Sequence, residues 1–175
     1  MKKSQPDNPG SKMRKRVESL FRRGTEFLHA GEPDRAVQPL EQAHELDPSD
    51  ADVALNLSGA YILTKKFRRA VPILEALSEQ EPDNPMVWTN LGAAYLGNPV
   101  LARDEEQRRA IAAFKRALEV DPVAPNVAYN IALIYRDRHE IDRAIYWFER
   151  AIKANPNDRD ARSILRRLLA LQEEE

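Results

Sequence analysis

The sequence predicts an all-α protein in which four copies of one helix-turn-helix repeat stack into a solenoid. The first observation is the repetition itself, because the same residue types recur in successive repeats of 34, 34, 40 and 34 residues. A period of this length indicates a supersecondary unit that buries its apolar face only against its neighbours. The second observation is a set of helix stop and start signals, such as Gly31-Glu32-Pro33 and Asn84-Pro85.

Four positions carry nearly the same residue type in every repeat. The repeats span residues 17–50, 51–84, 85–124 and 125–158. Position 11 is aromatic, position 20 is alanine, position 24 is leucine or phenylalanine, and position 32 is proline. These residues are Phe27, Tyr61, Tyr95 and Tyr135; Ala36, Ala70, Ala110 and Ala144; Leu40, Leu74, Phe114 and Phe148; and Pro48, Pro82, Pro122 and Pro156.

Repeat 3 shows the pattern most completely, with Trp88, Leu91, Gly92, Tyr95, Ala110, Phe114, Ala117 and Pro122. This set resembles the tetratricopeptide repeat family over residues 17 to 158. The resemblance implies a right-handed superhelix in which each repeat contributes an A helix and a B helix. It also implies that Trp88 and the position-11 tyrosines belong to the core, and that the protein binds other proteins.

Residues 1–11 are predicted to form a disordered basic leader, because prolines and a glycine stand among polar residues there. The helices are expected from about Lys12 to residue 158. Residues 1–16 hold six lysines and arginines and one aspartate, a net charge of +5. The remainder therefore carries −6, because the whole chain carries −1. Such an acidic body does not favour nucleic-acid binding, which needs cations along the groove.

Two local features depart from a regular repeat. Pro39 and Pro72 fall inside B helices, where we expect a local distortion rather than a break. Repeat 3 has six extra residues, and the inserted turn is placed at residues 97–103. Its apolar Val100 and Leu101 either pack on the solenoid or help to hold a ligand. The B helix that follows is expected to begin with a capping box of Asp104 and Gln107.

Residues 159–175 are predicted to form a C-terminal capping helix with an acidic tail. Leu165 and Leu169 supply an apolar stripe toward repeat 4, and Arg162 and Arg166 a charged outer face. A terminal element of a solenoid needs this combination, because its outer side meets water.

The resemblance implies that the concave face is a peptide-binding groove lined by positions 2, 5, 6, 9, 12 and 13 of each A helix. The groove residues selected are Asn56, Asn90, Asn130, Phe21, Leu55, Met86, Tyr129 and Arg22. Three of these are asparagines at position 6 of successive repeats. An asparagine amide both donates and accepts, so the column is suited to pair with the backbone of an extended peptide. The alternative is that asparagine is simply an ordinary choice at this position of the family.

Position 19 is arginine in all four repeats, in the first turn of each B helix: Arg35, Arg69, Arg109 and Arg143. One interpretation is a solvated edge neutralised by glutamates of neighbouring helices. The other is a docking strip for an acidic partner surface.

Composition and spacing do not favour catalysis. The chain has no cysteine, and its three histidines fall in different repeats without the paired spacing of a metal site. No apolar run reaches the roughly 18 residues of a membrane span. We therefore predict a cytoplasmic, non-enzymatic interaction module without cofactor or metal, which binds an extended peptide of a protein partner. The alternative function is a scaffold that docks a folded acidic partner, or itself, through the arginine edge.

Overall fold

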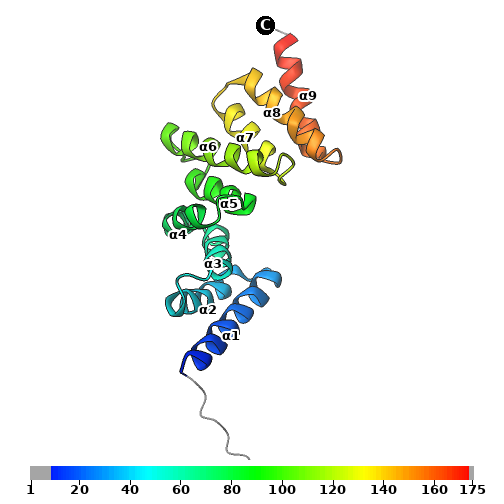
Figure 1. The fold of residues 1–175 in the computed structure, drawn as a ribbon. Coiled ribbons are helices and arrows are strands. Elements are labelled where there is room, and N and C mark those ends of the chain that lie inside the picture. The colour runs from blue at the N-terminus through cyan, green and yellow to red at the C-terminus, as the bar shows by residue number, and fades with distance from the viewer. Residues whose placement is uncertain (1–8, 174–175) are drawn as a thin grey trace, which may run out of the picture. The chain divides into compact units, whose positions relative to one another are not determined.

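The computed structural model describes residues 9–173, and this part of the chain is built of nine α-helices (Figure 1). They are α1 (Pro9–His29), α2 (Pro33–Leu46), α3 (Ala51–Leu63), α4 (Phe67–Gln80), α5 (Pro85–Leu96), α6 (Asp104–Val120), α7 (Val127–Asp137), α8 (Ile141–Ala154) and α9 (Arg159–Glu173). The all-α prediction is confirmed. Helices α2 to α8 fall within the four predicted repeats, α1 begins before the first repeat and ends inside it, and α9 follows the fourth.

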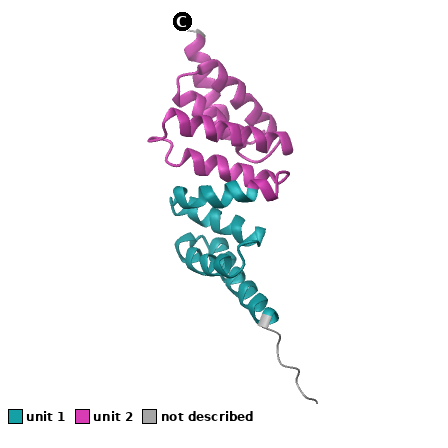
Figure 2. Cartoon of the chain, turned by 60° about the vertical axis from the view of Figure 1, so that its left-hand side comes forward, with its two compact units in different colours: residues 1–77 teal, residues 78–175 magenta. Residues whose placement is uncertain are grey.

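The chain divides after Leu77 into two compact units, shown in different colours in Figure 2. The N-terminal unit holds α1, α2, α3 and most of α4, and the C-terminal unit holds α5 to α9. Within the C-terminal unit each helix packs against the next along the chain. One continuous hydrophobic core runs through these helices, from Ala110 and Phe114 to Leu168.

The starts of the helices follow from local capping. The side chain of Asn84 accepts a hydrogen bond from the Met86 amide at 3.0 Å, and Pro85 occupies the first turn of α5 as predicted. The predicted capping box of α6 was wrong by one residue. Glu106 accepts from the Arg103 backbone N–H at 2.8 Å, because Arg103 and not Asp104 is the N-cap.

Two further expectations need correction or qualification at the N-terminal end. Helix α1 begins at Pro9, three residues before Lys12, because a proline in the first turn needs no hydrogen-bond acceptor. The rest of the predicted leader lies outside the described residues. Pro39 and Pro72 are accommodated inside α2 and α4, neither of which ends there.

The repeat packs through a large side chain at position 24 and a small residue at position 8. Leu40, Leu74, Phe114 and Phe148 are at most 1% exposed. A methyl group added to Gly92 would lie 2.6 Å from the Phe114 ring, and one on Gly24 would lie 2.5 Å from the Leu40 side chain. In repeats 1 and 3 the A and B helices therefore approach so closely that a side chain at position 8 would meet the residue at position 24.

Helix α9 packs on α8 and covers the end of the core. Ala161 and Leu168 are its buried residues, with Ile164 and Leu165 partly buried beside them. The predicted stripe was correct for Leu165 and wrong for Leu169, which is 40% exposed. The helix is rotated so that Leu168, one residue earlier, faces the core. If α9 is counted as the start of a fifth repeat at residue 159, position 8 is Arg166, where repeats 1 and 3 have glycine. A B helix could therefore not approach α9 as closely as α2 approaches α1 or α6 approaches α5.

Candidate functional site

The predicted groove residues divide between the two units. In the N-terminal unit, α1 carries Phe21 and Arg22, and α3 carries Leu55 and Asn56. In the C-terminal unit the corresponding residues on α5 and α7 are Met86, Asn90, Tyr129 and Asn130. Each set lies on the A helices of its own unit. Arg22 and Met86 are exposed, whereas the other six are half-buried.

The three asparagines of position 6 differ in their hydrogen bonding. The Asn56 side-chain amide donates to the carbonyl of Asp52 in the preceding turn of α3 at 2.8 Å. In the described part of the chain, the side chains of Asn90 and Asn130 make no intramolecular hydrogen bond, although both are half-buried. A half-buried amide without a protein partner retains its full donor and acceptor capacity for a ligand.

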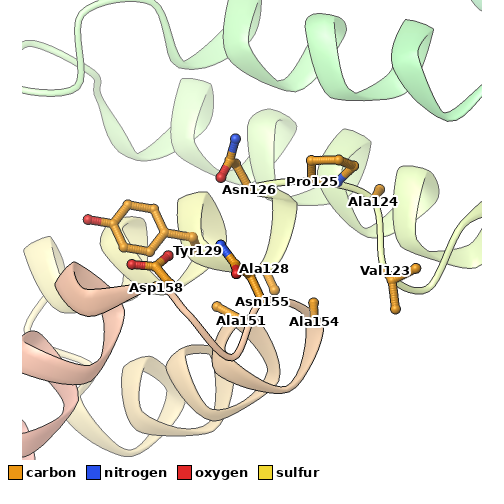
Figure 3. A pocket seen from close by; sticks show the side chains of 10 residues that line it. All are labelled: Val123, Ala124, Pro125, Asn126, Ala128, Tyr129, Ala151, Ala154, Asn155 and Asp158. Atoms are coloured by element: carbon orange, nitrogen blue, oxygen red, sulfur yellow. The ribbon is translucent and has the colours of Figure 1, made fainter.

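A pocket of about 240 Å³ opens in repeat 4 beside Tyr129 (Figure 3). Its lining comes from the start of α7, the end of α8 and the loops that precede α7 and follow α8: Val123, Ala124, Pro125, Asn126, Ala128, Tyr129, Ala151, Ala154, Asn155 and Asp158. Tyr129 and Asp158 lie at one end of the pocket and Val123 at the other. The buried part of the lining consists of alanine methyl groups, and the polar groups stand around it.

Tyr129 forms a fixed wall of this pocket. Its ring meets that of Phe148 edge to face, with centroids 5.7 Å apart and planes at 77°. Burial raises the pKa of the Tyr129 hydroxyl above its usual range, and the nearby charges of Asp160 and Asp158 raise it further. Asp158 also accepts a hydrogen bond from the Ala161 amide of α9 at 2.9 Å.

Asn126 precedes α7 in an unusual backbone conformation. Its φ of 62° lies in the left-handed region, which asparagine tolerates better than most residues. As the N-cap of α7 it makes no side-chain capping bond, unlike Asn84 before α5. Asn126 is one of the residues that line the pocket (Figure 3).

The sequence interpretation selected Tyr129 but missed the pocket beside it. The signal was present at position 4, which is Trp88 in repeat 3 and Ala128 in repeat 4. In repeat 3 the indole N–H of Trp88 donates to the Pro82 carbonyl at 2.7 Å, and the ring packs against the core. Repeat 4 has a methyl group at that place, so the corresponding space is open.

The inserted turn does not pack on the helices. Val100 is 90% exposed and Leu101 is 75% exposed, which contradicts the first of the two interpretations. The turn is held by its own hydrogen bonds, from the Val100 amide to the Asn98 side chain and from the Leu101 amide to the Asn98 carbonyl. These local bonds fix the backbone and leave the two apolar side chains outside the core.

The position-19 arginines have a partner that the sequence interpretation did not anticipate. Each guanidinium lies over the position-11 ring of its own repeat, at 4.2 Å for Arg35–Phe27, 4.5 Å for Arg69–Tyr61, 4.0 Å for Arg109–Tyr95 and 5.5 Å for Arg143–Tyr135. Three of them also pair with glutamates: Arg35 with Glu32, Arg69 with Glu41 at 2.7 Å, and Arg143 with Glu140 at 2.5 Å. The column therefore ties the start of each B helix to its A helix.

Neither a metal cluster nor a membrane-spanning helix is present in residues 9–173. No group of three or more histidine, aspartate or glutamate side chains there is arranged to hold a metal ion. None of the helices in this range combines the length and the apolar character that crossing a bilayer requires.

Solved structures with this fold include two families of bacterial proteins. MamA of Desulfovibrio magneticus RS-1 is 21% identical, with a TM-score of 0.71 over 82% of this chain and 78% of that one. PilF of Pseudomonas aeruginosa is 21% identical, with a TM-score of 0.74 over 93% and 71% of the two chains. At this identity the likeness shows the fold alone. A second MamA, from MSR-1, is 29% identical, with a TM-score of 0.68 over 80% and 77%.

Two curated relatives of known name are larger proteins. A DnaJ homolog subfamily C member 3 homolog of Dictyostelium discoideum is 25% identical over 169 residues, which are 90% of this chain and 33% of the relative. A peroxisomal targeting signal receptor of Eremothecium gossypii is 29% identical over 96 residues, 55% of this chain and 16% of the relative. The chain thus spans a third or less of the length of these relatives.

Two family models, both described as tetratricopeptide repeat, match residues 27–94 and 99–159. Their combined range covers most of the chain and three of the four position-11 aromatic residues, Phe27, Tyr61 and Tyr135. With its helix pairs, its small residues at position 8 and its buried residues at position 24, this chain belongs to the tetratricopeptide repeat family.

Proposed function

We propose that this protein binds an extended segment of a partner protein on the faces of its A helices, where asparagine side chains pair with the backbone of the segment. The observation that carries this proposal is the state of Asn90 and Asn130. Both stand at position 6 of successive A helices, both are half-buried, and in the described part of the chain neither amide has an intramolecular partner. An amide in that state is stabilised by a ligand backbone that supplies the missing hydrogen bonds.

Membership of the tetratricopeptide repeat family supports the proposal that this chain binds a partner protein. Tetratricopeptide repeat proteins generally mediate protein–protein interactions, and stacked repeats present extended surfaces to their ligands. One of the relatives is by name a receptor for a targeting signal. Its similarity covers about half of this chain, so recognition of a short segment is a reasonable function for such repeats here.

Energetics limits the affinity that the asparagines can supply. Each net hydrogen bond contributes about 0.5–1.5 kcal/mol, and part of that is offset by ordering the bound segment. Backbone pairing alone therefore supports weak binding without selectivity. Selectivity must come from side-chain contacts beside the asparagines, and a short peptide is expected to bind with a Kd on the order of micromolar.

The test replaces both asparagines of the C-terminal unit, Asn90→Ala with Asn130→Ala, and compares partner recovery from native lysate by mass spectrometry. Peptides from the recovered partners are then titrated by calorimetry. We expect the double variant to lose the partners and to weaken each peptide by about tenfold or more, since two hydrogen bonds are removed. Asn56→Ala should have a smaller effect, because the Asn56 amide is already engaged by the Asp52 carbonyl.

The matched control is Gln38→Ala with Gln42→Ala, which removes two exposed amides from α2. This control should leave recovery and peptide affinity unchanged. Equal recovery by the wild type, the asparagine variant and the control would reject the proposal.

The arginine edge remains the alternative prediction. Its guanidinium groups are already stacked on rings and, in three repeats, paired with glutamates. An acidic partner would have to compete with these contacts. For that reason we do not adopt the edge as the main binding surface. If the Arg69→Glu variant lost the partners and the asparagine variant kept them, the edge would replace the A-helix faces in this proposal.

A further inference from the structure

The pocket of repeat 4 corresponds to a space that repeat 3 fills with its own side chain. Trp88 and Ala128 both occupy position 4 of their repeats. Around Trp88 the structure shows what this space accepts: an indole ring against the core, with its N–H donated to the Pro82 carbonyl at 2.7 Å. The carbonyl that corresponds in repeat 4 belongs to Pro122.

We propose that the repeat 4 pocket receives an aromatic side chain of the bound partner segment, which takes the place that an indole occupies in repeat 3. This inference rests on the proposed function, because it names the side chain that anchors the same bound segment. It is carried by the substitution of an indole by a methyl group in a repeat that keeps the residues of positions 24 and 27. Position 27 is alanine in both repeats, as Ala117 and Ala151, and position 24 is phenylalanine in both.

The size of the pocket fits one large side chain. At about 240 Å³ it is smaller than the cavities that bind drug-sized molecules, which start at roughly 300 Å³. Ala128 and Ala151 are each only 5% exposed, so methyl groups line its inner part. An apolar ring that enters this space removes apolar surface from water without desolvating any charged group at the inner end.

The wall and rim favour an aromatic occupant over an aliphatic one. The Tyr129 ring is held by its edge contact with Phe148, so a second ring can pack against a fixed aromatic surface. The amides of Asn126 and Asn155 stand among the lining residues and can receive the polar edge of an indole or phenol. Asn126 makes no side-chain capping bond and has a left-handed backbone conformation.

The experiment uses the full chain labelled with ¹⁵N and N-acetyl-L-tryptophanamide as the probe, with N-acetyl-L-leucinamide as the aliphatic comparison. We expect chemical-shift changes in the amides of Ala128, Ala151 and Asn155, with a Kd on the order of millimolar for so small a ligand. The leucine probe should bind at least about fivefold more weakly, since it lacks the ring contact with Tyr129. Absence of shifts at about ten times the expected Kd, or equal binding of the two probes, would overturn the inference.

The decisive variant is Ala128→Trp, which restores in repeat 4 the residue that repeat 3 has. It should remain folded and lose probe binding, because its own indole fills the pocket. If it does not fold, Ala154→Phe blocks the same pocket from an exposed position on α8. Its matched control is Ala112→Phe, at an exposed position of α6 away from the pocket, which should bind the probe as the wild type does. Unchanged binding by a folded pocket-filling variant would contradict the inference.

The two proposals fail separately. The variant with Asn90→Ala and Asn130→Ala leaves the pocket intact and should bind the tryptophan probe with an unchanged Kd. If this variant loses partner segments while Ala128→Trp keeps them, the proposed function stands and the aromatic anchor is wrong. If Ala128→Trp loses partner segments and the asparagine variant keeps them, the anchor stands and backbone pairing by asparagine is wrong.

Discussion

Repeats 3 and 4 have the same residue types at positions 11, 24 and 27 but differ at position 4. Both have a tyrosine at position 11 with an arginine over its ring, a buried phenylalanine at position 24, and an alanine at position 27. Position 4 is tryptophan in repeat 3 and alanine in repeat 4. Repeat 3 is filled at that place by Trp88, whereas repeat 4 has a pocket beside Tyr129.

This difference separates architecture from recognition. Positions 11, 24 and 27, which help to hold the A helix on the B helix, carry the same residue types in the two repeats. Position 4 decides only whether the space near the end of the B helix is occupied from within.

The largest expected effect on stability comes from the buried phenylalanines at position 24. Phe114→Ala and Phe148→Ala should each lower the free energy of unfolding by about 3–5 kcal/mol, because both rings are at most 1% exposed. Urea denaturation followed by circular dichroism measures the loss. The two variants should differ in function, since only Phe148 supports the Tyr129 ring of the pocket. Equal probe affinity in both would show that the edge contact does not matter for the pocket.

A smaller effect on stability is expected from removing the Trp88 side chain of repeat 3. Trp88→Ala should cost about 2–4 kcal/mol, somewhat below the range for a fully buried tryptophan, because Trp88 is half-buried. It should also create in repeat 3 a space like that of repeat 4, and N-acetyl-L-tryptophanamide should then shift the amides of Ala117 and Leu118 as well. A folded variant with no second binding site would mean that the alanine at position 4 is not sufficient to make a pocket.

The smallest expected effect concerns the ion pairs that join the two repeats. Arg138, at the end of α7, contacts Asp104 and Gln107 of repeat 3 and donates to Glu140 of repeat 4 at 2.6 Å. The hydrogen bond from Arg138, with a further contribution from Arg143, holds the pKa of Glu140 below its usual value of 4.5. A carboxyl with a lowered pKa in the folded state stabilises the fold above its unfolded pKa and loses that contribution as the pH falls.

We therefore expect Glu140→Gln to flatten the fall of the unfolding midpoint between about pH 5 and pH 3, relative to wild type. The matched variant is Glu106→Gln. The pKa of Glu106 is also lowered, through Arg103, and both residues of this pair belong to repeat 3, whereas the partner of Glu140, Arg138, also contacts Asp104 of repeat 3. If Glu106→Gln flattened the profile more than Glu140→Gln, the joining role of Arg138 would be refuted.

Most of the helical framework was predictable from the sequence. Asn84-Pro85 marked the start of α5, and the apolar positions placed Phe114 and Phe148 in the core. The errors were of one to three residues at helix ends and faces. The capping pair of α6 and the inner leucine of α9 were each displaced by one residue, because neighbouring residues of the same kind compete for one place and packing selects between them.

The candidate site was less predictable. The asparagines could be located from position 6. The sequence did not show that the Asn56 side chain bonds to its own helix, while those of Asn90 and Asn130 have no partner within residues 9–173. The arginines of position 19 were predictable as a column and not as partners of the position-11 rings. Their contact depends on the distance between two helices that the sequence pattern does not give.

By itself the sequence determined the all-α class, the repeat period, the helix pairs and the residues of the core, because these follow from local propensity and from apolar spacing along a helix. Only the tertiary structure decided which asparagine amides lack a partner among the described residues, that Val100 and Leu101 are exposed, and that a pocket lies beside Ala128 and Tyr129. These properties depend on side chains from separate helices meeting in space, and a one-dimensional pattern does not contain that information.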